Sequence, residues 1–203
     1  IYFVEEEANK MKKFVALLLA VLMVASLCAC GQKDTGSDLQ TVTKGKLTMS
    51  TNAQFPPYES VADDGKGYEG TGFEGIDIEI AYALAQKLGL ELVVDDMDFD
   101  SALSAVQTGK SDIVAAGVTV TPERQNTMSF TDSYANGVQV VIVKEGSDIK
   151  SIDDLEGKKI GTQRGTTGFI YCSDDYGDDN VIGFDDGATA VQNLLAGKVD
   201  CVV

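Results

Sequence analysis

The turn that ends at Arg124 carries the first group of residues that could do chemistry. Gly117 is followed by the hydroxyl of Thr119 and the guanidinium of Arg124, and Pro122 suits the first turn of a helix. Free backbone N–H groups at a strand-to-helix turn, together with a guanidinium, would clamp a carboxylate. Each charged hydrogen bond contributes about 1.5–3 kcal/mol where solvent is excluded. The alternative is that Arg124 pairs only with Glu123 or with a surface acid.

A second turn of the same kind spans residues 161–168 and includes Gln163 and Thr167. Its glycines expose N–H groups and its threonines add donors, which suits an anion, although it could also be a plain connection with helix-capping threonines. Phe55 and Phe99 offer aromatic walls just beyond strand ends, and either ring could equally belong to the core. Ligands of open α/β sheets bind beyond the carboxyl ends of strands, where all these residues fall.

Several other chemistries are excluded or disfavoured. The chain has no histidine, which rules out Ser-His-Asp and Cys-His nucleophile systems and histidine-based metal sites. Its net charge of -16 disfavours a nucleic-acid partner. Gly70, Gly72 and Gly75 spell G-x-G-x-x-G, but no buried strand leads into them, so a loop is favoured over a dinucleotide site. The acidic run 174–180 lacks the spacing of a calcium loop and is interpreted as a solvated loop. We expect no metal and no cofactor.

Short apolar strands alternate with segments of helical period, which predicts mostly parallel sheets flanked by helices. The expected strands are 47–51, 90–94, 113–116 and 138–143, with helices around 76–88 and 102–106. After Lys144 the pattern begins anew with strands 159–162, 181–184 and 199–203 and a helix at 188–196. The fold class is therefore α/β with two lobes, 46–139 and 140–203, joined through a crossing at 138–144.

Residues 11–29 have the organisation of a secretory signal peptide. Met11 is followed by two lysines and by an apolar run, 14–27, which is shorter than the roughly 20 residues needed to cross a bilayer. A leucine three positions before Cys30 and an alanine just before it resemble a bacterial lipobox, so Cys30 is expected to carry a diacylglyceryl group. An ordinary signal peptide cleaved nearby is the alternative.

The segments on either side of the signal peptide are expected to lie outside the fold. Residues 1–10 contain three glutamates that no signal peptide should carry, and we interpret them as a non-native or upstream-translated extension. Residues 30–45 are polar and without apolar period, which is typical of a flexible tether. The fold is expected to begin near Lys46.

Cys172 and Cys201 are the only other cysteines of the exported part. A disulfide between them and two free, buried thiols are both open at this level. The sequence stops at Val203 within an apolar strand, and an unpaired strand there would be costly. We therefore expect the second lobe and its return crossover to be incomplete.

Taken together, separated motifs in order resemble the extracellular solute-binding proteins of amino-acid ABC importers, over Lys46 to Val203. The resemblance rests on 52–59 (with Phe-Pro-Pro-Tyr-Glu), 72–81 (Gly-Phe-Glu-Gly-Ile-Asp-Ile-Glu-Ile-Ala), 107–124, 129–134 and 161–167. It implies the two-lobed type II periplasmic-binding fold, with a mostly parallel sheet in each lobe.

The same resemblance implies how a zwitterion is held. Arg124 would bind the α-carboxylate, helped by the hydroxyl and N–H of Thr119 and by the N–H of Thr167. The carbonyls of Ala116 and Gly117 would accept from the α-ammonium. The family usually completes the ammonium site with an aspartate shortly after the strand in which this sequence stops.

The side chain of the ligand would lie between Phe55 and Phe99, with Asn52 and Gln163 placed to read its polar end. The implied function is capture of an amino acid by closure of the two lobes about a hinge near 138–144. The protein would be a monomer anchored through lipid on Cys30 at the outer face of the cell membrane, where it delivers solute to ABC permease subunits. It would not be an enzyme. A dehydratase on the same fold and a receptor input domain are the alternatives.

Overall fold

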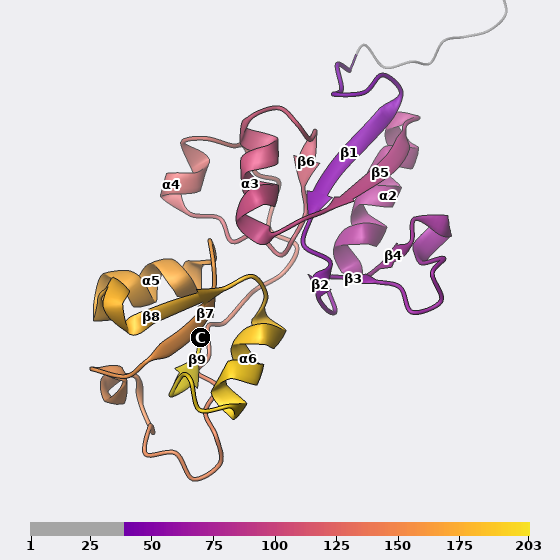
Figure 1. Ribbon diagram of the computed structural model, residues 1–203. Coiled ribbons are helices and arrows are strands. Elements are labelled where there is room, and N and C mark those ends of the chain that lie inside the picture. The colour runs from indigo at the N-terminus through magenta and orange to yellow at the C-terminus, as the bar shows by residue number, and fades with distance from the viewer. Residues whose placement is uncertain (1–38) are drawn as a thin grey trace, which may run out of the picture. The chain divides into compact units, whose positions relative to one another are not determined.

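The computed structural model describes residues 39–203 (Figure 1). The expected upstream extension, the signal peptide, Cys30 and most of the tether lie outside the described residues. In the part of the chain that is described, no helix is long and apolar enough to span a membrane.

The first parallel sheet is built around a central buried strand. Its order is β5-β1-β6, from β1 (Lys46–Thr51), β5 (Glu91–Asp96) and β6 (Ile113–Val114), with helices α2 (Ile76–Leu88) and α3 (Phe99–Gln107) beside it. Met49 packs against Ile78 and Ala81 of α2, whereas the hydroxyl of Ser50 donates to the carbonyl of Ala102 in α3. Because successive strand residues face opposite sides, the two helices cover both faces of the sheet (Figure 1).

A small antiparallel sheet lies next in the chain and was not predicted. It consists of β2 (Gln54–Phe55), β3 (Glu59–Val61) and β4 (Phe73–Glu74), with a 3-10 helix, η1 (Tyr68–Gly70), before β4. Strands of two or three residues are too short to show an alternating pattern in sequence. Gly70 ends η1 and no buried strand leads into it, as predicted, but the segment up to Gly75 is not a simple loop, because it contains β4.

The second parallel sheet has the order β8-β7-β9. Its strands are β7 (Ile160–Gln163), β8 (Val181–Phe184) and β9 (Cys201–Val202), and its helices are α5 (Thr167–Tyr176) and α6 (Gly187–Leu195). Ile160, Cys172 and Cys201 form one core cluster with Leu155. Short helices α4 (Pro122–Gln125), η2 (Ile152–Leu155) and η3 (Asp178–Asn180) complete the elements. Two parallel sheets with helices on them confirm the predicted α/β fold.

One predicted strand is wrong. Residues 138–143 form no strand: Ile142 makes a single antiparallel bridge to Val202, and Val138 is 83% exposed. The run is rich in β-branched residues, which favour strands, but a strand also needs a partner along its length, and in the described residues only one bridge exists here. The predicted strand 199–203 is likewise reduced to β9, Cys201–Val202.

Cys172 of α5 and Cys201 of β9 are free, which resolves the alternative left open by the sequence. Both are buried. Burial raises the pKa of Cys201 to about 11 and also raises the pKa of Cys172. Both thiols therefore stay protonated at neutral pH and behave as core side chains.

We expect alkylation by iodoacetamide at pH 8 to modify Cys172 and Cys201 at least roughly tenfold more slowly in the folded chain than in urea, because the thiolate is the nucleophile. Peptide mapping by mass spectrometry measures each site separately. Equal rates in the folded and unfolded chain, or a linked Cys172–Cys201 peptide, would contradict this assignment.

Candidate ligand-binding site

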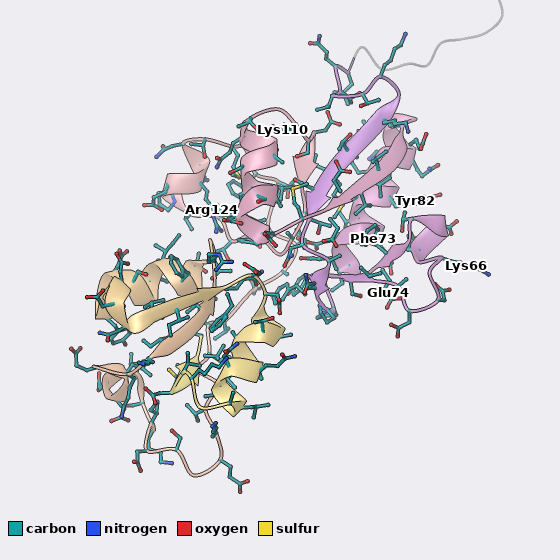
Figure 2. All side chains as sticks on the ribbon, viewed as in Figure 1. Lys66, Phe73, Glu74, Tyr82, Lys110 and Arg124 are labelled. Carbon is teal, nitrogen blue, oxygen red and sulfur yellow. The ribbon has the colours of Figure 1, made fainter. Side chains whose placement is uncertain are left out.

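Arg124 is held in place by the short helix that contains it (Figure 2). The side chain of Thr121 caps α4 by accepting from the N–H of Arg124, and Pro122 occupies the first helical turn. The capped turn carries the long side chain inward, so that only 8% of Arg124 remains exposed. The guanidinium of Arg124 therefore lies on the buried side of its segment. We name residues 116–124 the arginine turn.

The guanidinium of Arg124 is held by carbonyls and by an aromatic ring. Nη1 donates to the carbonyl oxygen of Thr119 at 2.8 Å, and Nη2 donates to that of Gly165 at 2.9 Å. Its central carbon lies 5.7 Å from the centre of the Phe99 ring, a cation–π distance. The alternative pairing with Glu123 is absent among the described residues, where Arg124 makes no ion pair. Burial lowers the pKa of Arg124, but an arginine stays charged at neutral pH.

Segment 161–168, which we name the threonine turn, meets the arginine turn through that Gly165 contact. Gly165 has φ +74°, and a Cβ there would lie 3.0 Å from Cβ of Asp100, so the backbones approach closely. Thr166 caps α5 by accepting from the N–H of Phe169. Thr167 is buried at the first position of α5, where the helix dipole favours an anion.

Asn52 and Gln163 contact each other. Nε2 of Gln163 donates to Oδ1 of Asn52 at 2.9 Å and also to the carbonyl of Asp185 at 3.1 Å. Nδ2 of Asn52 donates to the carbonyl of Met97. Two amides that the sequence places more than a hundred residues apart therefore join the end of β1 to the end of β7.

The two phenylalanines have different environments. Phe55 is 47% exposed and stacks on Tyr58, with ring centres 5.4 Å apart. Phe99 is buried with Leu103 and Ala116 and supports Arg124 instead of facing solvent. Phe55 thus offers an accessible aromatic face, whereas Phe99 acts through the guanidinium.

Gly117 lies beneath the ring of Phe55. Its φ is +56°, and a Cβ at this position would lie 3.1 Å from Cε1 of Phe55. Its N–H donates to Oδ2 of Asp77 at 2.8 Å. The structure therefore joins Gly117 to a carboxylate of α2 that sequence reasoning missed.

Glu59 and Asp77 are buried carboxyl groups next to this turn, with 1% and 0% of their surfaces exposed. Burial, and secondarily the charge of Asp77, raise the pKa of Glu59 to about 9. The sequence offered only weak signals: Glu59 follows a Pro-Pro-Tyr segment, and Asp77 stands in a first helical turn, where carboxylates are commonly exposed.

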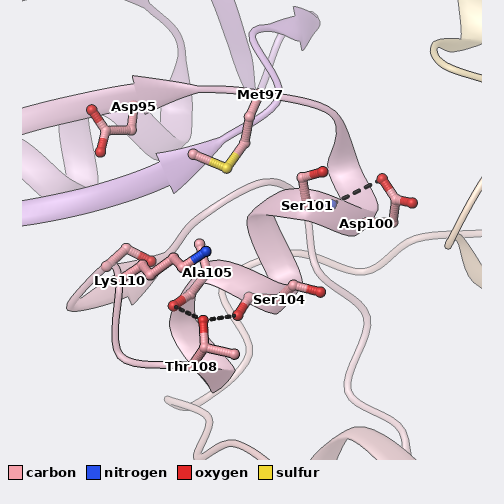
Figure 3. Close-up of a pocket in the computed structure, with 9 residues that line it drawn as sticks. Asp95, Met97, Asp100, Ser101, Ser104, Ala105, Thr108 and Lys110 are labelled. Carbon is pink, nitrogen blue, oxygen red and sulfur yellow. Dashed lines mark hydrogen bonds between the residues drawn. The ribbon is translucent and has the colours of Figure 1, made fainter.

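A separate cavity of about 540 Å³ lies between β5 and α3 (Figure 3). It is lined by Asp95, Met97, Asp100, Ser101, Ser104, Ala105, Thr108, Lys110 and Ser111. None of the predicted site residues lines it. Some of its polar side chains form hydrogen bonds with the backbone of α3, since the hydroxyl of Thr108 donates to the carbonyl of Ser104. We assign no ligand to this cavity.

Within residues 39–203, no group of three or more cysteine, aspartate or glutamate side chains is arranged to hold a metal ion.

The paired amides lie at the ends of β1 and β7, the capped start of α5 follows β7, and the buried guanidinium lies in the turn that follows β6. Residues 47–200 match the family model of the bacterial extracellular solute-binding proteins, family 3. The chain belongs to this family.

A named relative agrees with this membership. The arginine-binding extracellular protein ArtP of Bacillus subtilis (strain 168) is 39% identical over 156 residues, which are 77% of this chain and 57% of that protein. The chain thus spans little more than half the length of that relative.

Solved structures are similar at the level of both fold and sequence. The substrate-binding protein of an amino-acid ABC transporter has 36% identity and a TM-score of 0.70, over 78% of this chain and 69% of the other. The ancestral amino acid-binding protein AncCDT-1, named as a precursor of cyclohexadienyl dehydratase, has 32% identity and a TM-score of 0.69, over 78% and 69%. These neighbours confirm the two-lobed fold predicted from sequence.

Replacing Gly117 with alanine should lower the free energy of unfolding by more than the same change at Gly45. Both have positive φ, which costs an L-residue about 1–2 kcal/mol, but only at Gly117 would the new Cβ press against Phe55. At Gly45 it would meet nothing within 4 Å. Urea unfolding measures both losses, and equal losses would show that the Phe55 contact is without consequence.

Proposed function

We propose that this chain is the substrate-binding component of an ABC importer and that it captures an amino acid between the arginine turn and the threonine turn. The observation that carries the proposal is the guanidinium of Arg124, buried to 8% exposure, supported by Phe99 and directed at the threonine turn through the carbonyl of Gly165. A buried charge without a counter-ion is costly, so a ligand carboxylate would meet a site already prepared for it.

The carboxylate would replace a weaker partner. At present Nη2 of Arg124 donates to the neutral carbonyl of Gly165, whereas a bond to a carboxylate is charge-assisted and about twice as strong. Thr119 and the N–H of Thr167 would add donors. The carbonyls of Ala116 and Gly117 would accept from the α-ammonium.

L-Arginine is our first candidate ligand. The half-exposed ring of Phe55 offers a face on which a ligand guanidinium could stack, and Oδ1 of Asn52 is an acceptor that now receives only an amide of Gln163. The net charge of -16 would steer a cationic solute towards the protein. The Bacillus subtilis relative is named as an arginine-binding protein.

The remaining parts of the proposal concern delivery. The signal peptide would direct export, lipid on Cys30 would hold a monomer at the outer face of the membrane, and lobes 46–139 and 140–203 would close about 138–144. The closed form would be recognised by the permease subunits through its shape. No nucleic acid, metal or cofactor takes part.

A second candidate is a dehydratase, because one structural neighbour is named as a dehydratase precursor. An assay of water loss from prephenate-like acids distinguishes the two functions. A binding protein returns the acid unchanged.

Isothermal titration of the chain with L-arginine and a panel of common amino acids tests the proposed function. Replacing Arg124 with alanine should weaken binding at least roughly a hundredfold, since truncating one partner of a buried charge pair costs about 2–5 kcal/mol. Lys46 supplies a control cation, because its ion pair with Glu91 is largely exposed and it begins β1, at the opposite end of that strand from Asn52. The Lys46→Ala variant should bind within about threefold of the parent, as exposed pairs contribute little.

Circular dichroism of each variant confirms that it is folded. Unchanged affinity in Arg124→Ala, or no binding of any amino acid by the folded parent chain, would contradict the proposed function.

A further inference from the structure

Two carboxyl groups with no cation among their described neighbours are buried behind the arginine turn. Glu59 belongs to β3 and Asp77 to the first turn of α2. Oε2 of Glu59 and Oδ1 of Asp77 are both fully buried without a hydrogen-bond partner. Such orphaned oxygens are unusual in a folded interior and require a cause.

The three segments that surround the pair are fixed to one another by the backbone. The N–H groups of Ile76 and Asp77 donate to the carbonyls of Pro57 and Tyr58 at 3.1 and 2.9 Å. A Cβ on Gly75 would lie 2.2 Å from the carbonyl oxygen of Tyr58, so no larger residue could stand there. The start of α2 is therefore locked onto the hairpin that carries Glu59.

The third segment is the arginine turn, which Asp77 binds through the N–H of Gly117 at 2.8 Å. This bond has a consequence for the peptide unit that joins Ala116 to Gly117. In a planar trans peptide the N–H and the C=O point in opposite directions. Because the N–H of Gly117 points at buried Asp77, the carbonyl of Ala116 is directed away from it.

A single proton would satisfy both orphaned oxygens. Two ionised carboxylates in a dry site repel each other and lose hydration, so one of them holds a proton. Oδ2 of Asp77 already accepts the N–H of Gly117, so we place the shared proton on Glu59, from which it can reach the free Oδ1 of Asp77. The raised pKa of Glu59, about 9, has three causes: burial first, then the neighbouring charge of Asp77, then a hydrogen bond to Asp77.

The other groups that face the pair do not supply a positive charge. Tyr134 comes from the extended segment after α4, and burial together with Asp77 and Glu59 raises the pKa of its phenol. Tyr58, next to Glu59, also contributes to that rise. Tyr134 therefore stays neutral over the range in which Glu59 would titrate, and neither phenol can carry a positive charge.

We propose that Glu59 and Asp77 are positioning residues for the ligand site. Protonated Glu59 donates a hydrogen bond to the free Oδ1 of Asp77, and Oδ2 of Asp77 accepts the N–H of Gly117. This fixed peptide unit directs the carbonyl of Ala116 towards the ligand ammonium. The effect on the ligand rests on the proposed function. The sharing of a proton between Glu59 and Asp77 does not depend on that function.

The pair makes the protein sensitive to alkaline pH. The pKa of Glu59 rises from 4.5 to about 9 on folding, so the folded chain holds a proton that the unfolded chain has lost between these values. Stability therefore decreases as pH rises from about 4.5 to about 9 and is constant, for this group, outside that window.

The experiment compares the full chain with Glu59→Gln and Asp77→Asn. A glutamine keeps a neutral donor towards Asp77 and cannot titrate. An asparagine still accepts from the N–H of Gly117 and donates to Glu59, which can then ionise more easily. The readouts are the carbon-detected NMR shifts of the Ala116–Gly117 peptide unit against pH and the melting temperature against pH.

In the parent chain the peptide unit should titrate with a midpoint near 9. Glu59→Gln should abolish that titration and raise the melting temperature relative to the parent increasingly from pH 5 to 9. Asp77→Asn should move the midpoint down by two pH units or more. A purely structural role for the pair would change stability without a Glu59-dependent titration at Gly117.

The ligand arm measures the affinity for L-arginine of Glu59→Gln relative to the parent at each pH, which cancels the titration of the ligand itself. The ratio should be within about threefold at pH 7 and should favour the variant at least tenfold at pH 10. A titration midpoint of Glu59 near 4.5 would contradict the proposed proton sharing between Glu59 and Asp77. The same titration of Gly117 in the parent and in Glu59→Gln would also contradict it. If the titration is present but L-arginine does not bind, the proposed function is contradicted, whereas the proposed proton sharing between Glu59 and Asp77 is supported.

Discussion

The meeting of the arginine turn with the threonine turn is the constraint on which the rest of the site depends. A single donor–acceptor contact, from Nη2 of Arg124 to the carbonyl of Gly165, joins residues that are 41 positions apart. It places a buried positive charge beside the start of α5, where the helix dipole is also positive. Two sources of positive potential converge there, and a carboxylate is the chemical group that would relieve them.

Parallel strands explain why these residues converge. In each sheet the central strand, β1 or β7, ends where its parallel neighbours end, so the turns that follow are brought to one edge. Asn52 follows β1, the arginine turn follows β6 and Gln163 ends β7. The strands are short, and the helices between them carry the chain back. Chemistry thus collects at one edge of each sheet, whereas hydrophobic residues occupy the middle.

The interior treats its few charges in different ways. Arg124 stays ionised because carbonyls and an aromatic ring replace its hydration. Glu59 is buried beside another acid, and burial favours its neutral form. The opposite responses follow from chemistry: a guanidinium cannot give up its proton at accessible pH, but a carboxyl group readily accepts one.

By itself, the sequence determined the alternation of strands and helices, the two parallel sheets and the family, because hydrophobic period and local motifs are properties of neighbouring residues. It also placed Arg124, Gln163 and Asn52 after strand ends. Only the tertiary structure decided that Phe99 supports Arg124, that Asn52 and Gln163 bond to each other, and that residues 138–143 form no strand. It alone revealed Glu59 and Asp77, because the burial of a carboxyl group depends on segments far apart in the chain, and no local pattern records which of them will pack together.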